Sequence, residues 1–487
     1  MAFDAAELFR DHLPRKFDLG DRHFNPTFVQ ALKLVGLDKL YTRAQGCYVY
    51  DNEDHQYLDF LCGYRVLSLG HNHPAIKQAL TDAVAQDWPN MVQMDSSPLA
   101  GALASELVRR APAGLDVVRF GSSGSEAVEL AMKFSRRATG RSKLVATRNG
   151  YHGVTYGALS LAGQPERWQT GFEPMLPDCE LVPFNDADAL ERALKNRDVA
   201  AFIVEPIQGE AGFVTPDDEY LPRAQALCRF YGTQFVLDEI QTGLGRTGRF
   251  LAAEHWDLQP DMICLAKALS GGFVPVSATL MRRNIFLKVV DNVDNCALHF
   301  STFEGNNLAM IAGLATLNVL DTEGLVENSA RMGAVLQGRL RGLQQRHEFI
   351  HEVRGKGLFA GVRFGAPRTL RQRMAWKLAC DTADGFFGQC IVMALMRHHR
   401  IISQTAGNDP DVLDCTPALI ATEKEIDYFV NALDQVLESS KEVLGPVWEM
   451  GTDLMKRSIA NGVPLPSLQR KPANAERGAA IGAGPAQ

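Results

Sequence analysis

Two polar side chains follow two apolar runs in the middle of the chain. Residues 235–237 are followed by Asp238, and residues 262–266 are followed by Lys267. Such runs are typical of buried strands, and α/β sheets bind ligands at the carboxyl ends of their strands. A lysine at that edge can form a Schiff base with an aldehyde, and a carboxylate can keep a pyridine nitrogen protonated. Lys267 and Asp238 are therefore predicted to be the catalytic pair of a pyridoxal phosphate site.

Each of these residues also has an ordinary interpretation when it is considered alone. Most lysines are solvated surface groups, and an Asp-Glu pair after a strand often begins a turn or caps a helix. The prediction therefore depends on the combination of the two with further residues that fit the same cofactor.

A phosphate could bind where a predicted strand gives way to a helix at residues 120–127. Gly124 and Ser125 are small enough to let backbone N–H groups approach an anion, and a helix N-terminus favours negative charge. The alternative is that Ser123 or Ser125 only caps the helix, with Glu126 in its first turn. The segment is not a nucleotide P-loop, because the Gly-Lys-Ser/Thr ending is missing.

Three further loops supply side chains that suit such a site. Tyr151, after the predicted strand at 143–147, is the candidate for stacking on the pyridine ring, although packing is its commoner role. His152 is interpreted as a structural or hydrogen-bonding residue. Glu205 and Glu210, in the loop after another strand, either bond around the site or satisfy loop amides. The loop at 301–307 supplies the Thr302 hydroxyl, which could reach a phosphate, although considered alone the segment is more typical of an ordinary polar loop.

The elements that must position these residues alternate between strands and helices. Strands are predicted at 117–120, 143–147, 201–205, 234–238, 262–266 and 276–281, and an amphipathic helix is predicted after Gly124. This alternation indicates an α/β fold whose mainly parallel sheet is flanked by helices. Two short strands before residue 70 and a strand pair near 355–364 indicate a small α+β domain built from both chain ends.

The predicted domain boundaries follow these patterns. Residues 1–70 form the N-terminal part of the small domain, 71–335 the large cofactor-binding domain and 336–440 the C-terminal part of the small domain. Residues 441–487 form an extension. Its last part, 470–487, is rich in Ala, Gly and Pro and is predicted to be flexible.

The composition is that of a globular protein without a nucleic-acid or membrane partner. The 487 residues are 46% hydrophobic and 22% charged, and the net charge of −7 argues against nucleic-acid binding. No span of 18 apolar residues and no signal peptide is found. The nine cysteines form no Cys-x-x-Cys pair, which indicates a reducing cytoplasm, and no metal site is predicted.

Six motifs together resemble the class III aminotransferases of the fold type I pyridoxal phosphate enzymes. This family includes ornithine, 4-aminobutyrate and ω-amine aminotransferases, and the similarity covers about residues 40–435. The motifs are Gly-Ser-Glu-Ala at 124–127, Tyr-His-Gly at 151–153, Glu-Pro-Ile-Gln-Gly-Glu at 205–210, Leu-Asp-Glu-Ile-Gln-Thr-Gly-Leu-Gly-Arg-Thr-Gly at 237–248, Ala-Lys-Ala-Leu-Ser-Gly-Gly at 266–272 and Ser-Thr-Phe-Glu-Gly-Asn at 301–306.

The resemblance implies a role for each matching residue. Lys267 forms the Schiff base with the cofactor and moves the proton, Asp238 pairs with the pyridine nitrogen, and Gln241 approaches the ring hydroxyl. The phosphate contacts fall to Gly124 and Ser125, the ring stacking to Tyr151, and the substrate pocket to Tyr64. The threonine matching Thr302 comes from a neighbouring subunit in this family, which implies a homodimer.

One position departs from the family pattern. Many members carry a carboxylate-binding arginine near the C-terminus, where this chain has Asp414. Glu210 would then lose its cation and share the region with a second acid, unless a positive group matches them. This suggests an amine, diamine or amino-bearing metabolite as donor. The alternative is that Asp414 faces solvent and that an arginine elsewhere binds the acceptor carboxylate; the candidates are Arg65, Arg397 and Arg400.

The sequence therefore predicts a pyridoxal phosphate-dependent aminotransferase that moves an amino group to a keto acid or aldehyde. Two other interpretations remain. One is an isomerase on the same fold, such as an aminomutase or amino-acid epimerase, which would need no second substrate. The other is a binding protein that keeps the fold without catalysis, which the intact Lys267 and Asp238 disfavour.

Overall fold

A seven-stranded sheet forms the centre of the computed structural model, which describes residues 3–92, 95–370, 372–373, 376–377, 385–441, 449–453 and 456. The strand order is β4-β10-β9-β8-β7-β5-β6. From β9 to β6 neighbouring strands are parallel, whereas β10 is antiparallel to both β9 and β4. The strands are β4 (Leu115–Gly121), β5 (Lys143–Thr147), β6 (Cys179–Val182), β7 (Val199–Val204), β8 (Gln234–Asp238), β9 (Met262–Leu265) and β10 (Ser277–Arg282).

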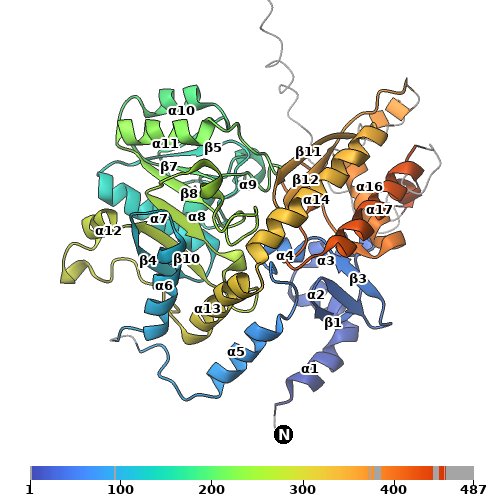
Figure 1. Cartoon of the computed structure of the whole chain (residues 1–487), viewed down its shortest axis with the longest axis horizontal. Helices are drawn as coiled ribbons and strands as arrows, with labels where there is room; N and C mark the ends of the chain where they lie inside the picture. Colours follow the sequence, from blue (N-terminus) through green and yellow to red (C-terminus); the bar gives the residue numbers. More distant parts are fainter. Residues whose placement is uncertain are drawn as a thin grey trace, which may run out of the picture.

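The strands are apolar because both faces of this sheet are covered. In β8, Phe235 and Leu237 belong to one buried cluster, while the intervening Val236 belongs to the other. Helices α7 and α12 pack on the side of Val236, and α11 and α13 lie on the opposite side (Figure 1). The predicted α/β fold with a mainly parallel sheet is confirmed. The sequence analysis missed β6, a four-residue strand at the sheet edge.

Helix α7 (Gly124–Thr139) begins and ends where its sequence dictates. The Ser123 hydroxyl accepts a hydrogen bond from the Glu126 amide, and the Glu126 carboxylate accepts from the Ser123 amide, which forms a capping box. Gly140 ends the helix with φ 70°, a left-handed conformation that glycine adopts without strain. The apolar stripe predicted from the sequence is buried against the sheet.

Two smaller sheets lie beside the central one, and one of them joins distant parts of the chain (Figure 1). Strand β3 pairs in parallel with β13, so the segment before residue 60 shares a sheet with residues beyond 400. The four-stranded sheet contains β1 (Tyr41–Gln45), β2 (Tyr48–Asp51), β3 (Gln56–Asp59) and β13 (Ile401–Ile402); the three-stranded sheet contains β11 (Ile350–Lys356), β12 (Phe359–Phe364) and β14 (Val412–Cys415).

The predicted domain boundaries remain predictions, and one of them falls inside a helix. Helix α14 (Leu325–Arg346) runs without a break across the predicted boundary at residue 336. The predicted flexible segment 470–487 lies outside the described residues. The other helices are α1 (Ala5–His12), α2 (Lys16–His23), α3 (Pro26–Val35), α4 (Cys62–Arg65), α5 (Pro74–Val84), α6 (Pro98–Arg110), α8 (Tyr156–Leu159), α9 (Pro165–Trp168), α10 (Ala187–Leu194), α11 (Tyr220–Tyr231), α12 (Arg283–Val289), α13 (Asn307–Thr322), α16 (Phe386–His399) and α17 (Glu423–Ser439).

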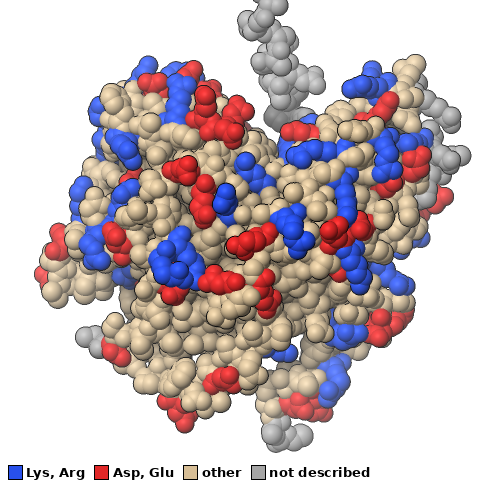
Figure 2. All heavy atoms as spheres, viewed as in Figure 1, with Lys and Arg blue, Asp and Glu red and all other residues tan. Residues whose placement is uncertain are grey.

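Four 3-10 turns complete the structure: η1 (Leu13–Arg15), η2 (Ala252–Trp256), η3 (Lys267–Ser270) and η4 (Val293–Asn295). No single helix in the described part of the chain is long and apolar enough to cross a membrane. Helices α13 and α14 pass that test of length and composition only as a pair bent by 61°. On the face shown in Figure 2, basic and acidic side chains are interspersed, so this face has no continuous basic stripe.

Candidate active site

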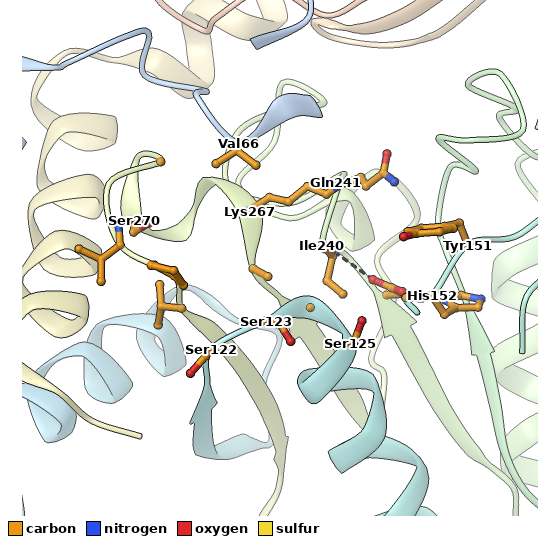
Figure 3. A pocket seen from close by; sticks show the side chains of 18 of the residues that line it. Val66, Ser122, Ser123, Ser125, Tyr151, His152, Ile240, Gln241, Lys267 and Ser270 are labelled. Carbon is orange, nitrogen blue, oxygen red and sulfur yellow. Dashed lines mark hydrogen bonds and ion pairs between the residues drawn. The ribbon is translucent and has the colours of Figure 1, made fainter. Parts of the chain in front are cut away.

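A cavity of about 470 Å³ lies at the carboxyl edge of the central sheet. Asp238 reaches it from the end of β8, and Lys267 reaches it from the start of η3, directly after β9. The N-terminus of α7 and the loop carrying Tyr151 complete the wall (Figure 3). The structure therefore brings together residues that are up to 143 positions apart in the chain, because neighbouring parallel strands end at one edge.

Lys267 projects across this cavity toward Gln241 (Figure 3). Its backbone has φ 36°, a sparsely populated conformation for a side chain of this size. Burial and then the nearby Arg65 guanidinium lower the pKa of Lys267 to about 8, against the opposing effect of Glu210 and Asp238. A larger fraction of the lysine is therefore neutral near physiological pH, which is the form that can attack a carbonyl.

Asp238 is buried and held by two hydrogen bonds. His152 Nδ1 lies 2.8 Å from Asp238 Oδ2, and the Ile240 amide donates to Oδ1 at 3.1 Å. Burial lowers the pKa of His152, but the hydrogen bond from His152 to Asp238 outweighs it and raises this pKa overall. The sequence analysis left His152 as a structural or hydrogen-bonding residue; the structure assigns it to orienting Asp238. The sequence feature that could have indicated this role is the position of His152 directly after Tyr151.

The N-terminus of α7 offers two unused donors to the cavity. Ser123 and Glu126 cap the helix between them, and the amides of Gly124 and Ser125 have no hydrogen-bond partner among the described residues. A Cβ added at Gly124 would lie 2.9 Å from Ile240 Cδ1, so only glycine fits here without displacing Ile240. Free amides at a helix N-terminus are suited to an anion such as a phosphate.

The loop that carries Tyr151 is fixed by a buried carboxylate. Glu205 Oε1 accepts from the Tyr151 amide at 2.9 Å, and Glu205 Oε2 accepts from the Gly209 amide at 3.1 Å. Burial raises the pKa of Glu205 to about 7, against the effect of His152. The Tyr151 ring lines the cavity and lies 5.6 Å from the Trp168 ring, measured between centroids. Glu205 thus satisfies loop amides, one of the two roles considered from the sequence, and in doing so positions Tyr151.

Arg65 corrects the prediction made for the two acids Glu210 and Asp414. Its guanidinium donates to Glu210 Oε1 at 3.1 Å, to Asp414 Oδ2 at 2.5 Å and to Gln241 Oε1 at 2.6 Å. The acids therefore have a cation, and the premise that they lack one is wrong. Asp414 is fully buried, so the alternative that it faces solvent is also wrong. A residue near the N-terminus supplies the arginine that is absent at position 414.

The remaining candidates lie at different distances from the cavity. Tyr64 is half exposed beside Arg65, and its pKa is raised by burial and by the charges of Glu210 and Asp414. Arg397 and Arg400 line a separate cavity near Asp51, so they do not reach this site. Thr302 is exposed in the loop between η4 and α13 and does not line the cavity of its own chain.

The residues fit pyridoxal phosphate by their chemistry as well as by their places. The two free amides of α7 suit a phosphate, the Asp238 carboxylate suits a protonated ring nitrogen, and the Lys267 amine suits an aldehyde carbon. Tyr151 and Ile240 supply apolar surface for a ring. The sequence analysis did not single out Ile240. Among the described residues no cluster of His, Cys, Asp and Glu is suited to a metal ion.

Comparison with known proteins gives the same family by three routes. Residues 34–437 match the family model described as aminotransferase class-III. The aminotransferase PigE of Serratia sp. is 34% identical over 472 residues, which cover 90% of this chain and 55% of PigE. This chain therefore spans little more than half of that relative's length. The putrescine aminotransferase of Pectobacterium atrosepticum is 38% identical over 359 residues, covering 70% of this chain and 75% of the relative.

The fold agrees with solved structures of the same group. The ornithine aminotransferase of Toxoplasma gondii superposes with a TM-score of 0.78 at 30% sequence identity, over 90% of this chain and 99% of that protein. The similarity therefore extends over both the central sheet and the smaller sheets beside it.

Proposed function

Because the chain belongs to the class III aminotransferases, and is therefore a pyridoxal phosphate-dependent transaminase, we propose that Lys267 and Asp238 are its catalytic pair and that its amino donor is an amine or diamine. The observation that carries the first part is the convergence of Lys267, Asp238 and two free helix amides on one cavity. The proposed donor class follows from the charges of Arg65, Glu210 and Asp414.

Each residue has a defined task toward the cofactor. The amides of Gly124 and Ser125 hold the phosphate, and Tyr151 stacks on the ring. Asp238, oriented by His152, pairs with the ring nitrogen. Bound pyridoxal phosphate supplies an electron sink for the bond that is broken in the substrate. Lys267 would hold the cofactor through its amine, and as a free amine it would accept and return the proton of the substrate carbon.

The proposed donor class rests on the charged side chains around Arg65 that a substrate would meet. Arg65 is 1% exposed and is already bonded to two carboxylates, whereas the Glu210 side chain is 15% exposed. Burial raises the pKa of Glu210, but Arg65 outweighs this and lowers it, so Glu210 is ionised at neutral pH. A substrate that reaches this wall therefore meets a carboxylate rather than an available guanidinium. An ammonium group is the complementary partner.

A homodimer is part of the proposal, with Thr302 acting on the partner's cofactor. The segment at 298–308 touches the segment at 86–92, because the Asn307 amide donates to Asn90 Oδ1 at 3.0 Å. Exposed aromatic side chains lie along these two segments: Trp88 at 49%, Phe300 at 54% and Phe303 at 64%. Apolar surface of this kind marks a protein interface. We also propose a cytoplasmic location; the described Cys47, Cys62, Cys179, Cys228, Cys264, Cys296 and Cys415 form no disulfide.

One experiment tests the reaction and the donor together. The purified holoenzyme is mixed with putrescine, other diamines, monoamines and α-amino acids without any acceptor, and the visible absorption of the cofactor is followed. We expect loss of the band with diamines and amines, one carbonyl product per active site, and slower change with α-amino acids. Conversion of a single compound to its isomer, without loss of the band, would instead support the isomerase. A protein without any visible band would contradict the proposed cofactor site.

A further inference from the structure

The short turn that carries Arg65 has an unusual backbone. Cys62, Gly63, Tyr64 and Arg65 have φ values of 51°, 58°, 59° and 71°, so four consecutive residues are left-handed. Only one of them is glycine, and the left-handed region is costly for the other three. Strain of this kind persists where the surrounding contacts hold it, and it gathers at functional sites. The contacts that Arg65 makes identify what the turn is for.

Arg65 donates hydrogen bonds from both of its terminal nitrogens, whereas its buried Nε has no hydrogen-bond partner among the described residues. Its Nη1 donates to Gln241 Oε1 and Glu210 Oε1, and its Nη2 donates to Asp414 Oδ2. The guanidinium also lies 5.2 Å from the Phe213 ring centroid. A lysine has one nitrogen at the end of a flexible chain and cannot bridge three acceptors in this way. The site is therefore built for an arginine.

Gln241 is the only partner of Arg65 in this group that also lines the cofactor cavity with Lys267. Because a guanidinium can only donate, Gln241 must turn its carbonyl oxygen toward Arg65. Its amide nitrogen is then free to donate, and it lies 3.2 Å from Glu210 Oε1. A Cβ at Gly209 would lie 2.2 Å from Gln241 Oε1, so the glycine leaves the room that this placement of Gln241 needs.

This inference rests on the pyridoxal phosphate site proposed above. We propose that Arg65 is a positioning residue, which fixes the orientation of Gln241 at the cofactor cavity and pairs with the two carboxylates of Glu210 and Asp414 beside it. It acts through its neighbours and does not itself react.

The charges around Lys267 agree with this role. After burial, Arg65 is the largest influence that lowers the pKa of Lys267, while Glu210, Asp238 and Glu205 raise it. Removal of the Arg65 charge would take away the charge that opposes these three carboxylates at Lys267. The nitrogen of Lys267, free or bound to the cofactor, would then hold its proton more strongly.

The test compares Arg65→Met with Arg65→Lys in the holoenzyme. Two quantities are measured: the midpoint of the pH titration of the cofactor's visible absorption, and the dissociation constant of pyridoxal phosphate. For Arg65→Met we expect the midpoint to rise by about one pH unit. We expect the dissociation constant to rise about tenfold, because Gln241 loses the donor that orients it. Arg65→Lys should restore most of the midpoint, since it keeps the charge, but not the affinity.

Arg246 provides the matched control, because it is an equally buried arginine whose hydrogen-bond partner Ser68 lies three residues after Arg65. It donates to Pro417 O, Leu358 O and Ser68 Oγ, and none of these hydrogen bonds goes to Gln241, Glu210 or Asp414. Arg246→Lys should lower the unfolding temperature without moving the titration midpoint.

Each outcome of this test either supports or contradicts the positioning role of Arg65. If Arg65→Met leaves both quantities at their wild-type values, the positioning role is wrong, even if stability falls. If Arg65→Met does not fold, Arg65→Met/Asp414→Leu removes the cation and one carboxylate together, and the same two quantities apply. An unchanged affinity in that double variant would also overturn the proposal. A wild-type protein without a visible band would instead contradict the cofactor site itself, which is a separate result.

Discussion

Lys267 is the residue on which the proposed chemistry depends most, and its surroundings decide when its amine can react. Glu205 and Glu210, from the loop after β7, and Asp238, from the end of β8, raise its pKa, but burial and Arg65 have the larger effect. A neutral lysine is the nucleophile that a Schiff base requires. The site therefore prepares Lys267 for the cofactor before any cofactor binds.

Lys267 should give the apoenzyme a characteristic pH dependence. Its pKa is lowered from 10.5 to about 8, so the amine is mostly protonated below that value and mostly neutral above it. The rate of cofactor capture should rise about tenfold per pH unit below this midpoint and level off above it. Stopped-flow absorption of apoenzyme mixed with pyridoxal phosphate measures this rate. A rate that keeps rising to pH 10 would show that Lys267 titrates as an ordinary lysine.

His152 should matter for catalysis more than for folding. His152→Gln removes the imidazole that bonds to Asp238 but keeps a polar side chain of similar length, so the Asp238 carboxylate loses the hydrogen bond that orients it. We expect kcat to fall by about 10-fold to 100-fold, which corresponds to one such bond. Steady-state kinetics with saturating cofactor measure the change. Tyr156→Phe, an exposed residue outside the cavity, is the control and should keep wild-type kcat.

At the scale of elements, the first turn of α7 uses different residues for helix capping and for the proposed phosphate binding. Ser123 and Glu126 use their side chains to begin the helix, whereas Gly124 and Ser125 offer amides without a partner to the cavity. The turn is a helix cap and, in our proposal, also an anion site, which explains why both interpretations of this segment were open from the sequence.

Substitutions at these two positions should have different effects. Ser123→Ala removes the cap and should lower the free energy of unfolding by about 1 kcal/mol with little change in cofactor affinity. Gly124→Ala places a methyl group against Ile240 and beside the free amides, so cofactor affinity should fall about tenfold or more. Chemical denaturation and cofactor titration measure the two quantities. Equal loss of affinity in both variants would argue against this division of roles.

At the scale of the whole molecule, the exposed place of Thr302 leads to a test of the dimer. Chains with Lys267→Ala and chains with Thr302→Ala are each expected to have little activity alone. In a mixed dimer, one site would combine Lys267 of one chain with Thr302 of the other and would be intact. Random reassembly of equal amounts should therefore restore about a quarter of wild-type sites.

The control for this experiment is a mixture in which both substitutions are carried by the same chain and the partner is wild type. That mixture also contains mixed dimers, but in them neither site has both residues if Thr302 acts across the interface. No recovery of activity in the first mixture would show that Thr302 acts within its own chain or not at all.

Much of the site could be predicted because the residues that its chemistry needs occur in local sequence patterns. Asp238 and Lys267 follow apolar runs, and strand ends of an α/β sheet meet at one edge, so their proximity follows from the pattern alone. The capping sequence at Ser123 and the glycine after it likewise fix where α7 begins. Helix periodicity and apolar runs, both local properties, placed most of the central sheet.

Arg65 shows what the sequence alone did not decide. The residue is 145 positions from Glu210 and 349 from Asp414, and nothing near it in the chain indicates that it pairs with either. Its place depends on a left-handed turn and on the packing of two small sheets against the large one. The sequence by itself determined the family and the cofactor, and it predicted the residues that we propose to hold that cofactor. Tertiary structure decided the charge at the substrate wall, because a buried ion pair depends on which distant segments meet in space.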